Sequence, residues 1–185
     1  MSNAESRNVD LRPLPPLEVR CWVAGSAKTK GSLTAQLAPG RTAAGGRRVR
    51  MVESVAGSSA WRAATVQAVM AVLGGAPTPD GPRLPCRPWA QAVEVGLCVW
   101  LPRPRTAAAG GWPWTRRAGD VDKLQRNVGD ALVDVGLLAD DSLIVSWSAT
   151  KLWAPDPIQA GALILVRPAP SEPRAPEWTT VDMGR

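Results

Sequence analysis

The feature that most constrains the fold is a helical pattern followed by a β-rich run, between residues 119 and 151. On a wheel of 100° per residue, one helix face is apolar and another face is polar. The apolar face consists of Val121, Leu124, Val128, Ala131, Leu132 and Val135. On the polar face, Asp122, Arg126 and Asp130 follow i, i+4, i+8 spacing. Gly136 is placed to end the helix, so the pattern predicts an amphipathic helix that packs on a core.

The rest of the chain predicts further strands and one more helix. Strands are expected over residues 17–24, 49–52, 92–102, 143–153 and 162–168. Ser58 or Ser59 is expected to cap a helix that ends near Leu73. The continuous apolar run at 92–102 predicts a central strand covered on both faces, and the last two strands are expected to form a hairpin. This order predicts an α+β fold, a single domain with two main helices on a mixed sheet.

Composition narrows the possible partners and chemistry. The net charge of +6 and pI near 10.0 predict a polyanionic partner, either nucleic acid or an acidic membrane surface. No apolar run approaches the roughly 18 residues that span a bilayer, and no signal peptide is evident, which predicts a soluble intracellular protein. The domain is expected over residues 17–167, between a flexible N-terminal segment (1–16) and a proline-rich flexible tail (168–185).

Several chemistries are excluded by the residues that the chain lacks. The sequence contains no histidine and no tyrosine, which excludes an imidazole general base and a tyrosyl-DNA intermediate. Cys21, Cys86 and Cys98 are odd in number and widely spaced, so they are interpreted as reduced residues, with Cys21 and Cys98 buried in strands. If the protein cuts nucleic acid, the obvious catalyst that remains is a metal held by carboxylates.

Two acidic pairs are candidates for such a site. Asp120 and Asp122 open the helix, and Asp140 and Asp141 precede a strand that ends in Lys151. A helix opening and a strand opening could bring several carboxylates together around a divalent cation. The alternatives are ordinary: Asp120 as a helix cap, Asp122 as an acid favoured by the helix dipole, and Asp140 and Asp141 as parts of a turn.

Two basic loops are candidates for contacts with phosphates. The first loop carries Lys28 and Lys30. The second, at 103–119, has no periodicity and carries Arg103, Arg105, Arg116 and Arg117, with Trp112 and Trp114 between them. Arginine next to aromatic side chains suits phosphate binding and base stacking. Alternatively, the lysines lie on a solvated hairpin tip and the tryptophans pin the long loop to the domain.

The acidic segments resemble the RusA family of Holliday-junction resolvases, especially its members from actinobacteria and their phages. The resemblance lies in GDVDKLQRNVGDAL at 119–132 and LLADDSLIVSWSATK at 137–151. The family pattern is D-x-D-N-L-x-K opening a helix, then D-A-L, then D-D-x-x-V before a strand that ends in lysine. Weaker similarity continues upstream, in VAGSAKTKGSLT and MVESVAGSSAWRAA, so that the matches together cover roughly Leu17 to Val166. Asp130, Asp140 and Lys151 also match family positions.

This resemblance implies a function and a set of site residues. By resemblance, Asp120, Asp122 and Asp141 bind the catalytic metal, Mg²⁺ or alternatively Mn²⁺, and Arg126 occupies the position of the helix lysine. Arginine keeps the charge but cannot transfer a proton, and Lys123 stands where asparagine is common. Arg126 or Lys151 could neutralise a phosphate, so both are candidate catalytic residues.

The resemblance also implies a substrate and an assembly. It implies an endodeoxyribonuclease that resolves four-way DNA junctions by paired symmetric nicks, in recombination and repair. It further implies a homodimer without a membrane partner, in the cytoplasm of a bacterial cell or a phage-infected host. Two alternatives stay open: a junction-binding protein that does not cleave, and a nuclease that acts on flaps or replication forks.

Overall fold

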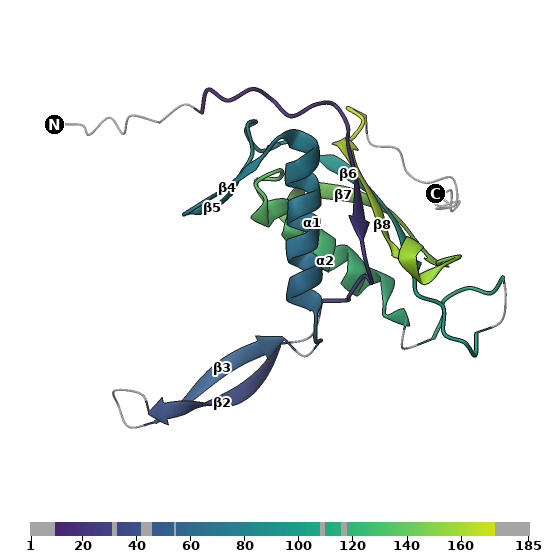
Figure 1. Ribbon diagram of the computed structural model, residues 1–185. Coiled ribbons are helices and arrows are strands. Elements are labelled where there is room, and N and C mark those ends of the chain that lie inside the picture. Colours follow the sequence, from purple (N-terminus) through teal and green to yellow (C-terminus); the bar gives the residue numbers. More distant parts are fainter. Residues whose placement is uncertain are drawn as a thin grey trace, which may run out of the picture.

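The centre of the molecule is a four-stranded mixed sheet, seen in a computed structural model that describes residues 10–30, 33–41, 46–53, 55–107, 110–115 and 118–172. The strand order is β1-β8-β6-β7 (Figure 1). These strands are β1 (Val19–Ala24), β6 (Val93–Leu101), β7 (Ile144–Trp153) and β8 (Gly161–Pro168). With α1 (Ser58–Leu73) and α2 (Val121–Asp134), the sheet confirms the predicted α+β fold with two helices.

The predicted hairpin of the last two strands is wrong, because β6 lies between them. β6 pairs parallel with β7 and antiparallel with β8. A parallel neighbour needs a crossover connection, and here the crossover between β6 and β7 contains α2. The chain therefore returns to the other edge of β6 for its last strand.

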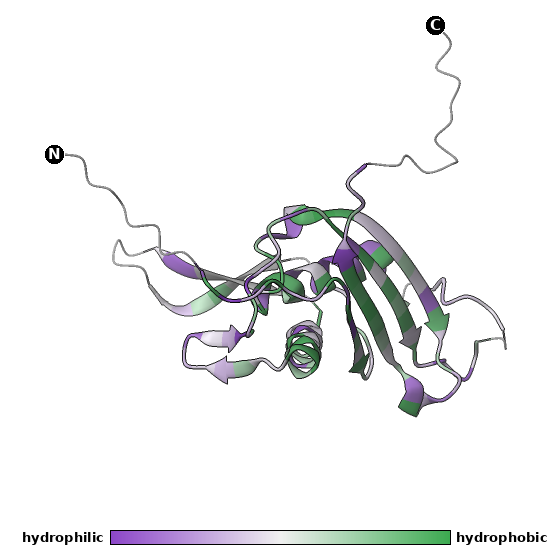
Figure 2. Cartoon of the chain, turned by 90° about the horizontal axis from the view of Figure 1, so that it is seen from above, coloured by the Kyte–Doolittle hydropathy of each residue, from purple (hydrophilic) through white to green (hydrophobic). Residues whose placement is uncertain are grey.

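Both helices pack against one face of the sheet, and Figure 2 shows α1 end-on beside the strands. The β6 residues on the helix side, such as Val95 and Val99, are buried, whereas Cys98 and Trp100 on the opposite face are only half-buried. On that open face, the rings of Trp22 and Trp100 lie 5.6 Å apart at 51°. The prediction of a central strand is confirmed, but its expected coverage on both faces is wrong, because both helices of the described residues lie on the same face.

Helix α2 begins and ends as the sequence predicts. Asp120 is its N-cap residue, with extended backbone, and Gly136 follows its C-terminus at φ 74°. The amide of Gly136 donates to the carbonyl of Val133, and that of Leu137 to the carbonyl of Leu132, which together form a Schellman motif. The apolar face is buried in the core, except that Val121 is half-buried.

The predicted cap of α1 is wrong. Gly57, at φ 83°, is the N-cap residue, and no side chain caps the helix. Ser58 is buried instead, and its hydroxyl accepts a hydrogen bond from the Asn127 side chain at 3.1 Å. The Ser58 hydroxyl, which the sequence assigns to a local cap, is therefore bound to Asn127, a residue far along the chain.

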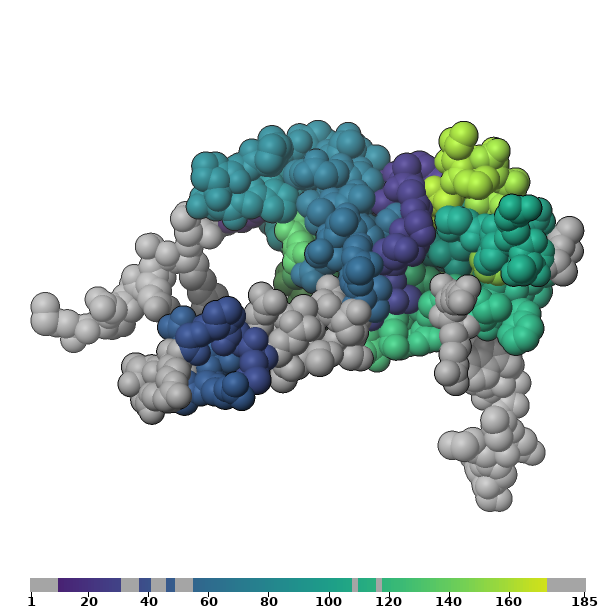
Figure 3. Space-filling model, turned by 60° about the horizontal axis from the view of Figure 1, so that its bottom comes forward, coloured from purple at the N-terminus to yellow at the C-terminus, as the bar shows by residue number. Residues whose placement is uncertain are grey.

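Two small hairpins complete the described structure. β2 (Leu33–Arg41) pairs with β3 (Arg47–Glu53), and β4 (Ala76–Thr78) pairs with β5 (Gly81–Arg83). Only β3 was predicted, because Gly and Pro residues in the other segments indicate loops. The β2–β3 hairpin projects away from the main sheet (Figures 1 and 3).

No helix in the described part of the chain is long and apolar enough to cross a bilayer. The expected flexible ends, which fall largely outside these residues, stay predictions.

Candidate metal and nucleic-acid site

Asp122 and Asp141 line one shallow depression of about 220 Å³ on the surface. Asp122 lies in the first turn of α2, and Asp141 begins the 3-10 turn Asp141–Leu143 that leads into β7. Arg126, Gly129 and residues of the β7 start complete the walls. The structure therefore brings together a helix opening and a strand opening, with one carboxylate from each.

Asp120 does not line this depression. Its side chain is 63% exposed, and its carboxylate lies 3.3 Å from the ammonium of Lys123. Side chains two positions apart on a helix do not face each other, so Asp120 and Asp122 diverge at the helix start. Within the described residues, no group of three or more acidic, histidine or cysteine side chains could hold a metal ion. Of the three carboxylates that the family resemblance implies, only Asp122 and Asp141 line this depression.

The structure separates the adjacent residues Asp140 and Asp141. The carboxylate of Asp140 accepts a hydrogen bond from the backbone amide of Ser142 at 2.9 Å and caps the short turn. Hydrogen bonding to Ser142 lowers the pKa of Asp140 below its usual value. Asp140 therefore caps the turn, and it also lines a second depression, of about 200 Å³, beside Asp130, Asp134 and Asp141.

The two candidate catalytic cations have different surroundings. The Arg126 guanidinium lies 3.7 Å from the Asp122 carboxylate, is 70% exposed and lines the depression. The ammonium of Lys151 donates a hydrogen bond of 2.6 Å to the carbonyl of Gly119. Arg126 can thus reach an incoming phosphate, while Lys151 holds the chain where it enters α2.

The loop that carries Lys28 and Lys30 is fixed against α2. The amide of Lys30 donates to the carbonyl of Lys123 at 3.0 Å, and its ammonium lies 2.5 Å from Asp130. Arg62 of α1 also pairs with Asp130, at 3.2 Å. The Lys30 ammonium therefore pairs with a carboxylate that it shares with Arg62, whereas Lys28 is exposed.

Asn127 is a structural residue that the sequence reasoning missed. It is buried, and its amide donates to the carbonyl of Lys28 at 2.8 Å and to the hydroxyl of Ser58 at 3.1 Å. One side chain thus joins α2 to the first basic loop and to the start of α1. The signal was present: an asparagine at the border of an apolar helix face needs buried partners.

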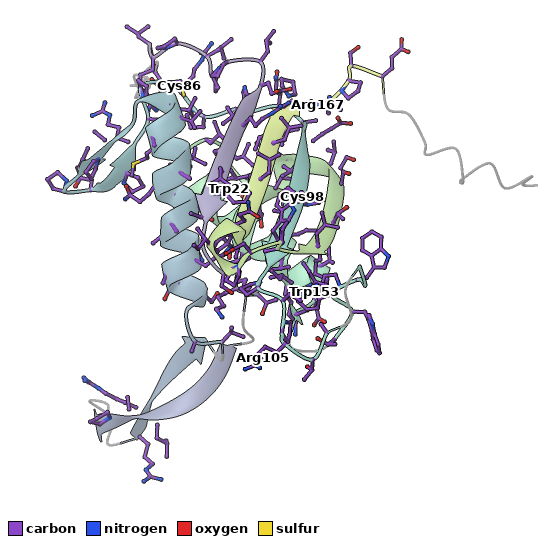
Figure 4. All side chains as sticks on the ribbon, turned by 45° about the vertical axis from the view of Figure 1, so that its right-hand side comes forward. Trp22, Cys86, Cys98, Arg105, Trp153 and Arg167 are labelled. Carbon is purple, nitrogen blue, oxygen red and sulfur yellow. The ribbon has the colours of Figure 1, made fainter. Side chains whose placement is uncertain are left out.

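A deeper cavity, of about 320 Å³, lies at the carboxyl ends of β6 and β7. Its walls include Lys28, Ala56, Pro104, Gly119 and Trp153. The cavity therefore joins the first basic loop, the connection into α1, the second basic loop and the start of α2. Figure 4 shows Trp153 and Arg105 in this region.

The second basic loop is only partly described. Arg103 and Arg105 are exposed beside Pro104, while Arg116 and Arg117 lie outside the described residues. Trp112 and Trp114 are 63% and 84% exposed. The two rings line one depression together with Val121, Ala149, Thr150 and Lys151, so the alternative that they pin the loop to the domain stays open beside a role in base stacking.

The cysteines are unsuited to catalysis. All three are free thiols, and burial raises the pKa of Cys21 to about 11. Burial also raises the pKa of Cys86 and of Cys98, although Cys98 is only half-buried, contrary to the prediction. Because the thiolate is the reactive form, none of the three is an activated nucleophile.

Comparison with known proteins identifies the region that contains this site. A family model described as endodeoxyribonuclease RusA matches residues 79–159. No curated protein matches the chain. The matched region contains β6, α2 and β7, and with them both carboxylates of the depression.

Proposed function

Because the chain belongs to the RusA family of endodeoxyribonucleases, we propose that it resolves four-way DNA junctions by Mg²⁺-dependent, paired symmetric nicks in recombination and repair. The observation that supports this proposal is the depression shared by Asp122, Asp141 and Arg126. Two carboxylates from separate segments face one surface there, with a cation beside them. Mg²⁺ is commonly bound through one or two carboxylates together with waters and substrate phosphates.

The donor set of the depression fits Mg²⁺. Asp122 and Asp141 offer only hard oxygen ligands and would hold the ion, whereas Asp120, the third ligand that the family resemblance implies, does not line the depression. Mn²⁺ prefers the same ligand types. When bound, the metal supplies Lewis acidity that activates water and offsets charge on the phosphate.

The protein groups around the depression orient the substrate. Arg126 is placed to neutralise a phosphate oxygen, and as a guanidinium it binds phosphate without giving up a proton. Lys151 acts through the backbone, because it holds the carbonyl of Gly119 next to Asp120. An added Cβ at Gly129 would lie within 4.0 Å of Ile144, Trp147 and Asp141, so the glycine lets α2 pack closely beside the start of β7.

The direct test is cleavage of a synthetic four-way junction with and without Mg²⁺. We expect symmetric nicks on two opposing strands in Mg²⁺ or Mn²⁺, and intact strands in a chelator. Flapped, forked and linear duplexes of the same sequences serve as controls. Junction binding without nicks would favour the non-cleaving alternative, and faster cleavage of flaps or forks would favour the other nuclease.

Paired nicks also predict a homodimer. Two symmetric incisions need two sites, and a two-fold dimer of identical chains provides them. We expect light scattering at micromolar concentration to give about twice the 19.6 kDa mass of one chain. A 19.6 kDa species alone, both with and without junction DNA, would contradict the proposal.

A further inference from the structure

The β2–β3 hairpin is a separate two-stranded sheet that stands away from the body (Figures 1 and 3). Its strands are paired from Leu33 and Glu53 outward, with an irregularity between Leu37 and Arg41. At about 3.3 Å per residue, a strand of this length extends roughly 30 Å. An isolated two-stranded hairpin is marginally stable, so a projecting ribbon gains stability when a partner covers it.

The charge of this hairpin indicates which partner that is. Residues 33–53 contain four arginines, Arg41, Arg47, Arg48 and Arg50, and one acidic residue, Glu53. Arg47 and Arg48 are exposed, and no ion pair joins either of them to another described residue. Exposed arginines without an ion pair to a described residue, on a projecting ribbon, favour a polyanion over an apolar protein surface.

The base of the hairpin is tied to the end of the molecule where α2 begins. The loop before β2 is held by Asn127 and by the carbonyl of Lys123. After β3, Val55 and Ala56 share the walls of the 320 Å³ cavity with Lys28, Pro104 and Gly119. Lys28 and Arg105, the residue after the cavity-lining Pro104, are both exposed, so cations of the body lie around the cavity next to which the hairpin begins.

We propose that the β2–β3 hairpin is a second DNA-binding element, which holds one duplex arm of the junction while α2 presents the carboxylates to the scissile phosphate. This inference rests on the proposed nuclease function. The major groove of B-form DNA admits a two-stranded β-ribbon, and arginines along such a ribbon reach the flanking phosphates. The matched region 79–159 does not include the hairpin, so the family match does not assign this role.

The test removes two charges from the hairpin and two from elsewhere. The hairpin variant is Arg47→Ala with Arg48→Ala. The control is Arg20→Ala with Arg167→Ala, which removes equal charge from residues paired with Glu18 and Glu94. Metal-free binding of each protein to the junction and to linear duplex is titrated at several salt concentrations.

We expect the hairpin variant to bind the junction more weakly, with a salt slope lower in magnitude by roughly one to two units, about 0.9 for each lost phosphate contact. The control should keep the wild-type slope. At saturating protein, Mg²⁺-dependent cleavage by the hairpin variant should stay within a few-fold of wild type, because the carboxylates are intact.

The outcomes separate this inference from the nuclease proposal. If the hairpin variant kept the wild-type slope while the protein still cleaved junctions, the DNA-binding role would be wrong and the nuclease proposal would stand. An unchanged slope with loss of the dimer in light scattering would assign the hairpin to a second copy of the chain, and would also overturn the inference. A wild-type protein that neither bound nor cleaved junctions would overturn both.

Discussion

Asp141→Asn is expected to abolish Mg²⁺-dependent cleavage of four-way junctions while junction binding survives. The substitution removes one negative charge and one ligand oxygen from the depression that Asp141 shares with Asp122. Loss of an outer-shell partner of a metal already lowers metal affinity or activity by roughly 10- to 100-fold, so loss of a ligand should lower the cleavage rate by at least about 100-fold. Asp122→Asn should behave in the same way. Single-turnover cleavage at saturating protein, with metal-free binding measured in parallel, checks both variants.

The neighbouring residue provides the matched control. Asparagine caps a helical turn about as well as aspartate, so Asp140→Asn should keep the bond from the Ser142 amide and a cleavage rate within a few-fold of wild type. Equal losses for Asp140→Asn and Asp141→Asn would refute the separation of their roles. Wild-type cleavage by Asp141→Asn would show that the metal-site assignment is wrong.

Asp120→Asn tests the third carboxylate that the family resemblance implies. Asparagine preserves a helix cap but not an anionic ligand, so the two roles predict different rates. We expect cleavage to be lost, as for Asp141→Asn. An unchanged rate would mean that Asp120 only begins the helix and that the ion is held by Asp122 and Asp141.

Gly119→Ala is expected to produce the largest loss of stability among substitutions near the site. Gly119 has φ +75°, and an added Cβ would lie 2.4 Å from the Thr29 Cγ2 atom. A positive φ costs a residue other than glycine roughly 1–3 kcal/mol, and overpacking costs about 1–3 kcal/mol more. The free energy of unfolding, measured by denaturant titration, should fall by the sum of the two terms.

Two further variants separate the backbone strain from the steric clash. Gly136 also has a positive φ, 74°, but no atom lies within 4 Å of an added Cβ. Gly136→Ala should therefore lower the free energy of unfolding only by the backbone strain, roughly 1–3 kcal/mol. Thr29→Ser removes the methyl group that the new Cβ meets, and should restore part of the stability of Gly119→Ala. Equal losses for Gly119→Ala and Gly136→Ala would show that the loop does not pack closely on the start of α2.

The sequence by itself determined the elements whose signals are local. The 3.6-residue period predicts α2 and its buried face. Gly136 marks the end of α2, because the residue after a helix often adopts a left-handed conformation that favours glycine. Runs of apolar and β-branched residues likewise predict β6 and β7 to within one or two residues. The same local patterns placed Asp122 at the start of a helix and Asp141 just before a strand, and these positions made both residues candidates for the site.

Tertiary structure alone decided which of those residues meet, because contacts between distant segments leave no local pattern. Strand order depends on pairings across the whole chain, so the position of β6 between β7 and β8 was not predictable from either strand. The partners of polar side chains are equally non-local. Lys151 donates a hydrogen bond to Gly119, 32 residues away, and Lys30 pairs with Asp130, and neither partner could be predicted from the segment that carries the lysine. The projecting β2 strand was missed for the same reason, since its partner strand β3, and not its own composition, makes it a strand.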